Sequence, residues 1–190
     1  MRRYDYPLVQ ALDLDALATI TEAEADAGED DGLQGNQQYQ DIRFISWSLV
    51  AEAIRREAEL FDRFAGACDL DAEEARYREE LEAAILPEED FWGLDVGVIS
   101  AVLALSAMGA LTVSSCNAGG FGGRHVEKFP LIAMYLPRHI APDVLEIAEQ
   151  ADVGLDMLTG GLVRLYGATN YDLHRFARVA LDRQARLGLT

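Results

Sequence analysis

The stretch Asp95-Val-Gly-Val-Ile-Ser-Ala-Val-Leu-Ala-Leu-Ser-Ala-Met-Gly-Ala-Leu-Thr-Val-Ser-Ser, residues 95–115, decides the fold class. Its apolar part is interrupted by glycine and serine and changes character at Gly109, whereas a transmembrane helix needs about 20 apolar residues. Asp95 can cap a helix that runs to Met108, and Gly109 then supplies a left-handed stop. Residues 111–115 have the composition of a short strand. The stretch therefore predicts a buried helix followed by a strand, and no membrane partner.

Downstream of this stretch, proline and glycine mark the bounds of further elements. A second strand is predicted over 131–136 between two prolines, and a helix over 142–151 begins at a proline. Two strands over 153–158 and 162–166 flank Thr159-Gly160-Gly161 and form a hairpin. Asn170 is predicted to cap a final helix. This order of helix, strand, strand, helix, strand, strand and helix predicts an α+β domain over residues 91–190, with a mainly antiparallel or mixed sheet.

Upstream of residue 91 the sequence is helical and acidic. We expect an opening helix over 9–20 and a mobile acidic connection over 21–32. A strongly periodic helix follows from Asp41 and ends at Gly66. The next helix opens at Asp71, where Glu74 completes a capping box of the Asp-x-x-Glu type. The sequence therefore divides into an acidic helical region over 1–90, packed on the α+β domain over 91–190.

The net charge of −17 is concentrated in the first half of the chain. Residues 1–90 contain 24 acids and 8 bases, whereas residues 91–190 contain 9 acids and 8 bases. Such a surface repels nucleic-acid phosphates and anionic membranes, so we expect no nucleic-acid partner. The acidic helices either confer solubility or form a docking surface for a basic protein partner.

The two cysteines, Cys68 and Cys116, are far apart and belong to no CxxC pair. This usage disfavours a disulfide framework and fits a reducing compartment. The N-terminal Met-Arg-Arg-Tyr-Asp-Tyr-Pro is followed by no apolar stretch, which is unlike a signal peptide. We therefore expect a cytoplasmic protein.

The loop from Ser114 to His125 is the candidate functional site. Four glycines within five positions allow positive φ and close approach of the backbone to a ligand, and successive N–H groups can form an anion nest. The loop lacks the Gly-Lys-Ser/Thr ending of a P-loop, and a strand rather than a helix follows it. We predict that it binds a small polar or anionic ligand, with Ser114, Ser115, Asn117, Gly119, Gly120, Gly122, Gly123 and Arg124 as the binding residues.

Cys116 and His125 offer an enzymatic alternative, with the cysteine as nucleophile and the histidine as base. A reactive thiolate needs its pKa lowered by a cation or by backbone dipoles, which Arg124, His125 and the glycine N–H groups could provide. The competing interpretation is that Cys116 is a small buried apolar residue. The cysteines and histidines show no paired metal-ligand spacing, so we predict no metal site, and the sequence indicates no particular cofactor.

The loop and the helical segment upstream of it resemble parts of other proteins. The segment Gly93-Leu-Asp-Val-Gly-Val-Ile-Ser-Ala-Val-Leu-Ala-Leu-Ser-Ala and the loop Ser114-Ser-Cys-Asn-Ala-Gly-Gly-Phe-Gly-Gly resemble a group of uncharacterised bacterial proteins that share a buried helix, a strand and a Ser-Ser-Cys-Asn-x-Gly-Gly loop. This resemblance spans residues 92–185 and implies no function.

A local likeness, confined to Ser114-Ser115-Cys116 and a nearby glycine, is to the wybutosine-synthesis methyltransferase family, whose loop contains Ser-Ser-Cys-Ser-Gly-Arg. Here Asn117-Ala118 replace Ser-Gly, and the arginine follows only at Arg124. That family acts on tRNA, which the acidic first half disfavours, so the likeness implies no substrate.

Overall fold

The computed structural model describes residues 3, 5–83, 93–121, 123 and 127–188, with the side chains of 81–83 left aside. Its helices are α1 (Glu22–Asp31), α2 (Trp47–Ala65), α3 (Leu70–Ala83), α4 (Ile99–Ala107), α5 (Ala141–Gln150) and α6 (Asn170–Leu187). Its strands are β1 (Leu111–Cys116), β2 (Leu131–Tyr135), β3 (Gly154–Met157) and β4 (Val163–Tyr166). From α4 onward the element order is the predicted one, and the α+β class is confirmed.

The four strands form one antiparallel sheet in the order β1-β2-β4-β3. A short connection, residues 158–162, joins β3 to β4 as a hairpin, whereas the longer segment 117–130 joins β1 to its antiparallel neighbour β2. The register between β1 and β2 shifts between Thr112 and Ser114, which leaves Val113 as an extra residue in β1. β1 and β3 are therefore the two edge strands of the sheet.

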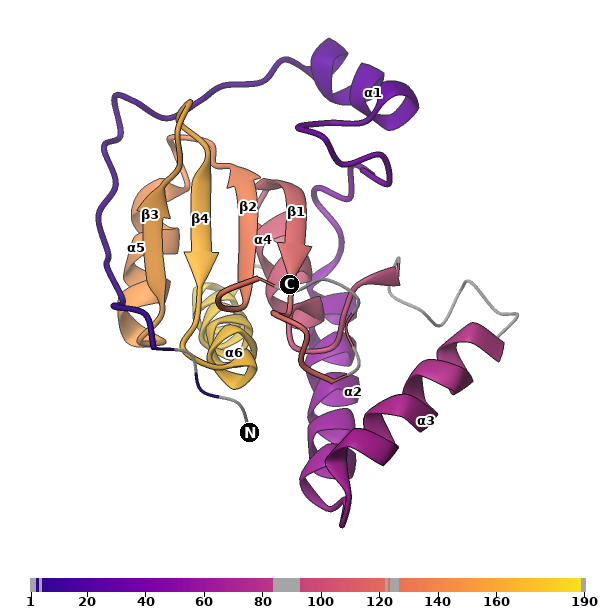
Figure 1. Ribbon diagram of the computed structural model, residues 1–190. Coiled ribbons are helices and arrows are strands. Elements are labelled where there is room, and N and C mark those ends of the chain that lie inside the picture. The colour runs from indigo at the N-terminus through magenta and orange to yellow at the C-terminus, as the bar shows by residue number, and fades with distance from the viewer. Residues whose placement is uncertain (1–2, 4, 84–92, 122, 124–126, 189–190) are drawn as a thin grey trace.

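Helices α4, α5 and α6 lie behind the sheet in the view of Figure 1, and α2 packs beside α4. α4 is apolar around its whole circumference and is buried from Ile99 to Ser106, as expected for a helix enclosed by neighbours. Val50 and Phe61 of α2 belong to the same core cluster as Leu105 of α4 and Leu165 of β4. The acidic helical region therefore contributes α2 directly to the core of the α+β domain.

The prediction of a helix over residues 9–20 is wrong. This N-terminal segment is extended and runs beside β3 and over the sheet toward α1 (Figure 1). Leu155 donates to the carbonyl of Val9 at 2.8 Å, and its own carbonyl accepts from Ala11 at 2.9 Å. The segment covers the free edge of β3. Its backbone forms hydrogen bonds with edge groups of β3 that would otherwise be unpaired, which a helix over the same residues would not do.

The acidic stretch 21–32, predicted to be a mobile connection, instead forms helix α1. A capping box starts the helix: Thr21 accepts from the Glu24 N–H at 3.2 Å, and the Glu24 carboxylate accepts from the Thr21 N–H at 2.8 Å. The buried face of α1 consists of Ala25 and Gly28, and the ring of Tyr39 lies against Gly28. A box of this type stabilises a helix start even where most other side chains face solvent.

The predicted caps of three other helices are also wrong. Helix α6 begins at Asn170, and its cap is the preceding Thr169, which forms a capping box with Asp172. In α3, the Ala72 N–H donates to the carboxylate of Asp69 at 3.1 Å, so the cap lies two residues before the predicted Asp71. In α4, Asp95 is not the cap, because the helix begins at Ile99 after Val98, which provides no side-chain cap.

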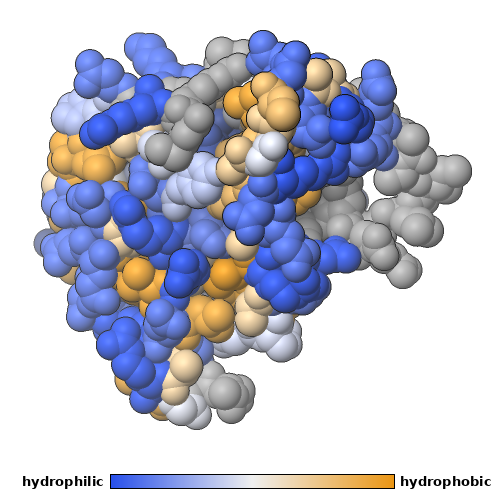
Figure 2. All heavy atoms as spheres, turned by 90° about the horizontal axis from the view of Figure 1, so that it is seen from below, coloured by the Kyte–Doolittle hydropathy of each residue, from blue (hydrophilic) through white to orange (hydrophobic). Residues whose placement is uncertain are grey.

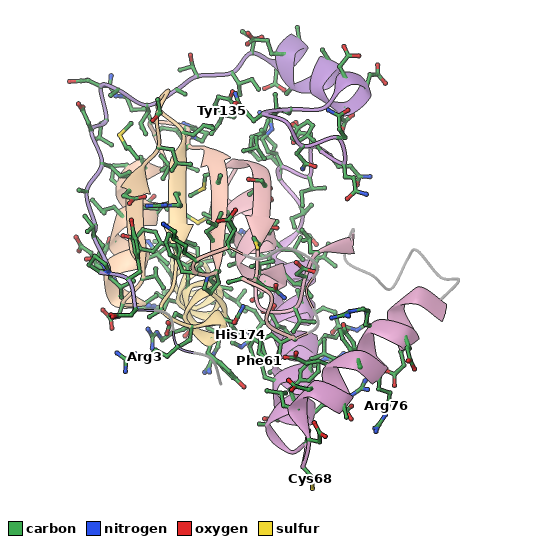
Figure 3. The ribbon with its side chains drawn as sticks, viewed as in Figure 1. Arg3, Phe61, Cys68, Arg76, Tyr135 and His174 are labelled. Carbon is green, nitrogen blue, oxygen red and sulfur yellow. The ribbon has the colours of Figure 1, made fainter. Side chains whose placement is uncertain are left out.

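The start of α4 is capped from another helix. The carboxylate of Glu57 in α2 accepts from the N–H groups of Gly97 at 2.8 Å and Ile99 at 3.1 Å. It also contacts the hydroxyl of Ser100 and lies 3.0 Å from Nδ1 of His174. His174, predicted to be partly exposed, is therefore buried in this network, beside Phe61 as Figure 3 shows.

Hydrophilic side chains cover most of the underside of the molecule, and hydrophobic ones form small interrupted areas there (Figure 2). Within the described residues, no helix has both the length and the apolar character needed to cross a bilayer.

Candidate functional site

The predicted site residues form two groups, one at the end of β1 and one in the turn that follows it. Ser114 is exposed and Ser115 is partly buried at the end of β1, whereas Cys116 and Asn117 are buried where the chain leaves the sheet. Ser114 pairs with Ala133 and Ser115 with Ile132 of β2. The two serines therefore lie beside the sheet edge, and the glycines follow in a separate turn.

A cavity of about 70 Å³ lies between the outer side of β1 and residues 36–42; we call it the β1 cavity. Its polar walls are hydroxyl and amide side chains, and no charged residue lines it among the described residues. The amide of Asn36 donates to the carbonyl of Val113 at 2.8 Å, which joins the two walls. The lining residues with polar side chains are Asn36, Gln38, Tyr39, Gln40, Thr112, Ser114 and Ser115.

Tyr39 is the unusual member of this lining. Its side chain is 3% exposed, and its hydroxyl has no hydrogen-bond partner among the described residues. Burial, followed by the nearby charge of Asp41, raises the pKa of this phenol, so the hydroxyl remains protonated. A buried hydroxyl without a partner destabilises a fold by about 1–3 kcal/mol. The hydroxyl oxygen is itself closed to solvent, so Tyr39 lines the β1 cavity through its other atoms.

Asn117 organises the turn that follows β1. Its side chain is fully buried, and its amide donates to the carbonyls of Val96 at 3.0 Å and Gly120 at 2.5 Å. Its carbonyl group accepts from the Gly119 N–H at 3.1 Å. The amide of Asn170 at the start of α6 in turn donates to the main-chain carbonyl of Asn117 at 2.9 Å. Asn117 therefore holds the turn in place and does not face a ligand.

The glycine N–H groups were predicted to face a ligand. Those of the described glycines instead donate hydrogen bonds within the turn. Gly120 donates to the main-chain oxygen of Asn117 at 3.2 Å, and Gly123 donates to Gly120 at 2.9 Å. A Cβ on Gly123 would lie 2.1 Å from the Asn117 side chain, so a larger residue there requires that side chain to move. The glycines accordingly permit a tight turn, and the described part of the loop presents one N–H, that of Phe121, to a side chain from elsewhere in the chain.

Cys116 lies in surroundings that oppose nucleophilic reactivity. The residue is 5% exposed. Burial raises the pKa of its thiol, and hydrogen bonds from the backbone of Ala118 and Glu127 counteract only part of this rise. A raised pKa lowers the thiolate fraction at neutral pH, whereas a cysteine nucleophile requires the opposite.

Three of the predicted site residues, Gly122, Arg124 and His125, lie outside the described residues. Among the described residues, no group of three or more His, Cys, Asp or Glu side chains could hold a metal ion.

The buried trio of Ser100, Glu57 and His174 combines the residue types of a hydrolase triad, but not its geometry. Nδ1 of His174 lies 3.3 Å from the Ser100 hydroxyl and 3.0 Å from Glu57, so one ring nitrogen faces both partners. In a catalytic triad the two ring nitrogens serve the two partners separately. Ser100 and Glu57 are moreover 0% and 1% exposed. The trio therefore joins α2, α4 and α6 and is closed to a substrate.

Two larger hollows, of about 350 and 410 Å³, lie along the N-terminal segment and α1. They share Thr19, Ile20 and Tyr135, and the Tyr135 hydroxyl accepts from Gln34 at 2.6 Å. Within the described residues, neither hollow is lined by a residue of the predicted site.

Sequence reasoning missed the residues that complete the β1 cavity and the turn. Gln38, Tyr39 and Gln40 belong to a polar stretch that has no helical or strand period, so its pattern gave no sign that it would lie against β1. Glu74 was interpreted as a helix cap although its carboxylate contacts the loop.

Comparisons with protein-family models, with curated proteins and with solved structures gave no match to this chain. The resemblances of the Ser-Ser-Cys loop therefore remain predictions.

Proposed function

We propose that the protein binds a small polar ligand in the β1 cavity, next to Ser114 and Ser115. The observation that carries this proposal is the lining of the β1 cavity, where hydroxyl and amide side chains gather and no described residue is charged. Polar groups in folded proteins are nearly always satisfied, by protein or by a bound molecule. A polar ligand in the β1 cavity exchanges hydrogen bonds with these lining groups.

The chemistry of the lining favours an uncharged ligand. Hydroxyl and amide groups both donate and accept hydrogen bonds, which suits amides and alcohols. The described lining offers no cation to balance an anion. One water needs about 10–15 Å³ of such space, so a cavity of about 70 Å³ accepts a group of roughly five non-hydrogen atoms.

The two other functions considered from the sequence have weaker support. The raised pKa of the buried Cys116 thiol disfavours the enzymatic alternative. Docking of a basic partner on the acidic helices remains a prediction, since solvation alone accounts for the exposed carboxylates of Asp26, Asp30 and Asp31 on α1.

Titration of the ¹⁵N-labelled protein with acetamide, glycerol and inorganic phosphate tests the proposal. We expect acetamide or glycerol to shift the backbone amide signals of Ser114, Ser115 and Gln38 saturably, and phosphate to leave them unchanged. Thr112→Val removes a hydroxyl from the lining with little change of shape and should weaken the response by about three-fold to ten-fold.

Tyr135→Phe is the matched control, because it removes a hydroxyl that contacts Gln34 and does not line the β1 cavity. This variant should respond as the wild type does. The proposal is wrong if neither acetamide nor glycerol shifts the signals of the β1 cavity, or if Thr112→Val and Tyr135→Phe respond alike.

A further inference from the structure

The glycine-rich turn contacts a carboxylate from a distant helix. The N–H of Phe121 donates to Oε1 of Glu74 in α3 at 2.8 Å, across 47 residues of sequence. Glu74 is 8% exposed, so its carboxylate is largely withdrawn from water. Hydrogen bonds from backbone N–H groups stabilise a carboxylate in such a position. The turn therefore already holds an oxyanion, which α3 supplies.

The shape of this turn does not depend on Glu74. Asn117 accepts from Gly119 and Gly120 through its side-chain and main-chain oxygens, and Gly123 donates to Gly120. Asn170 fixes Asn117 from α6. These bonds lie inside the turn or at its base, so loss of the carboxylate leaves the Phe121 N–H in a preformed position.

Phe121 itself is fixed in an uncommon backbone conformation. Its φ is 51°, in the left-handed region that side chains other than glycine rarely adopt. Its ring packs against Phe61 and Phe64 of α2, with ring centroids 5.2 and 5.0 Å apart, and against Tyr171 of α6. This packing compensates for the strain and directs the N–H toward α3.

Within its described residues, helix α3 packs mainly on α2, and Figure 1 shows it projecting away from the sheet and its helices. Arg63 of α2 pairs with Glu73 at 2.5 Å and with Glu80 at 2.7 Å. The rings of Phe64 and Tyr77 meet at 5.4 Å. Separation of α3 breaks these contacts with α2 and leaves the packing of α4 on α2 and α6 in place, so the core can stay folded without α3.

We propose that the Phe121 N–H is part of an oxyanion-binding site, and that Glu74 is its internal occupant, which a carboxylate or phosphate ligand displaces together with α3. The ligand and Glu74 compete for the same donor, so α3 regulates access to the turn. This second site is independent of the β1 cavity and does not rest on the function proposed for it.

Removal of the internal competitor tests this inference. We expect Glu74→Ala to bind inorganic phosphate or acetate about ten-fold more tightly than the wild type, because a charged occupant no longer holds the donor. Binding is followed in ¹⁵N-labelled protein through the Phe121 amide signal, in separate titrations with phosphate and with acetate. A response to only one of the two probes identifies which oxyanion the turn accepts.

Glu79→Ala is the matched control, since it removes an exposed carboxylate from the same helix, away from the turn contact. It should bind both probes as weakly as the wild type. Glu74→Gln retains a carbonyl that can accept from Phe121, so it preserves the fold if Glu74→Ala does not, and should bind the probes with intermediate affinity. Equal affinities of the Glu74 and Glu79 variants, or a Phe121 signal that no probe shifts in any variant, would show that Glu74 is a structural clip and overturn the inference.

Discussion

At the scale of single residues, the two cysteines occupy contrasting surroundings. Cys68 is exposed at the end of α2, where Figure 3 places it at the tip of the molecule. Cys116 is buried at the end of β1, and burial raises the pKa of its thiol. Alkylation requires an accessible thiolate. Burial of Cys116 and the raised pKa of its thiol therefore both slow its alkylation relative to that of the exposed Cys68.

We therefore expect iodoacetamide at neutral pH to modify Cys68 at least about ten-fold faster than Cys116. Mass spectrometry of peptides from a time course gives both rates in one sample. Cys68→Ser provides the control, because the remaining thiol should stay unmodified until the protein is unfolded by denaturant. Faster labelling of Cys116 in the folded protein would instead support the enzymatic alternative.

At the scale of elements, helix α4 depends on a residue that belongs to another helix. Its first N–H groups lack a side-chain cap from its own sequence, and Glu57 of α2 provides the acceptor for Gly97 and Ile99. The same carboxylate lies beside Ser100 and His174. One buried side chain therefore positions α2, α4 and α6 relative to one another.

Glu57→Ala should destabilise the protein by about 3 kcal/mol or more, because it leaves several buried donors without an acceptor. Urea denaturation followed by circular dichroism measures the change in unfolding free energy. Glu59→Ala is a suitable comparison: Glu59 is exposed on the same helix and pairs with Arg55, so its loss should change stability by less than about 0.5 kcal/mol. A Glu57 variant as stable as the Glu59 variant would contradict this account of the start of α4.

At the scale of the whole molecule, the charge of −17 opposes compaction. Helix α1 contains six carboxylates and no base, and most of them face solvent. Ion pairs such as those of Arg43 with Glu22 and Asp41 offset part of this repulsion. The excess of acids over bases nevertheless leaves most carboxylates of residues 1–90 without a cation to balance them.

Salt should therefore stabilise the protein. Raising NaCl from about 10 mM to 0.5 M shortens the screening length from roughly 30 Å to a few Å, which weakens repulsion between distant carboxylates. We expect the melting temperature at pH 7 to rise by several degrees, as measured by differential scanning calorimetry. A melting temperature that falls with salt would mean that the ion pairs outweigh the repulsion.

The sequence determined the elements of the second half, from α4 to α6, and hence the antiparallel sheet. Apolar periodicity and the glycines and prolines between elements are local signals, and they agree with the tertiary packing there. Local signals were insufficient in the first half, where residues 9–20 gain their hydrogen bonds from β3 and α1 relies on a capping box and one buried ring.

The sequence also predicts a candidate site at Ser114 to His125, but only the tertiary structure decided how its described residues are packed. Asn117 closes the turn, Cys116 is withdrawn from solvent, and Ser114 and Ser115 face a cavity completed by residues 36–42. Tyr39, which lines the same cavity, and Glu74, which accepts from the Phe121 N–H, lie far away in the chain. Contacts between such distant positions depend on how packed elements meet in space, which no local pattern of residues encodes.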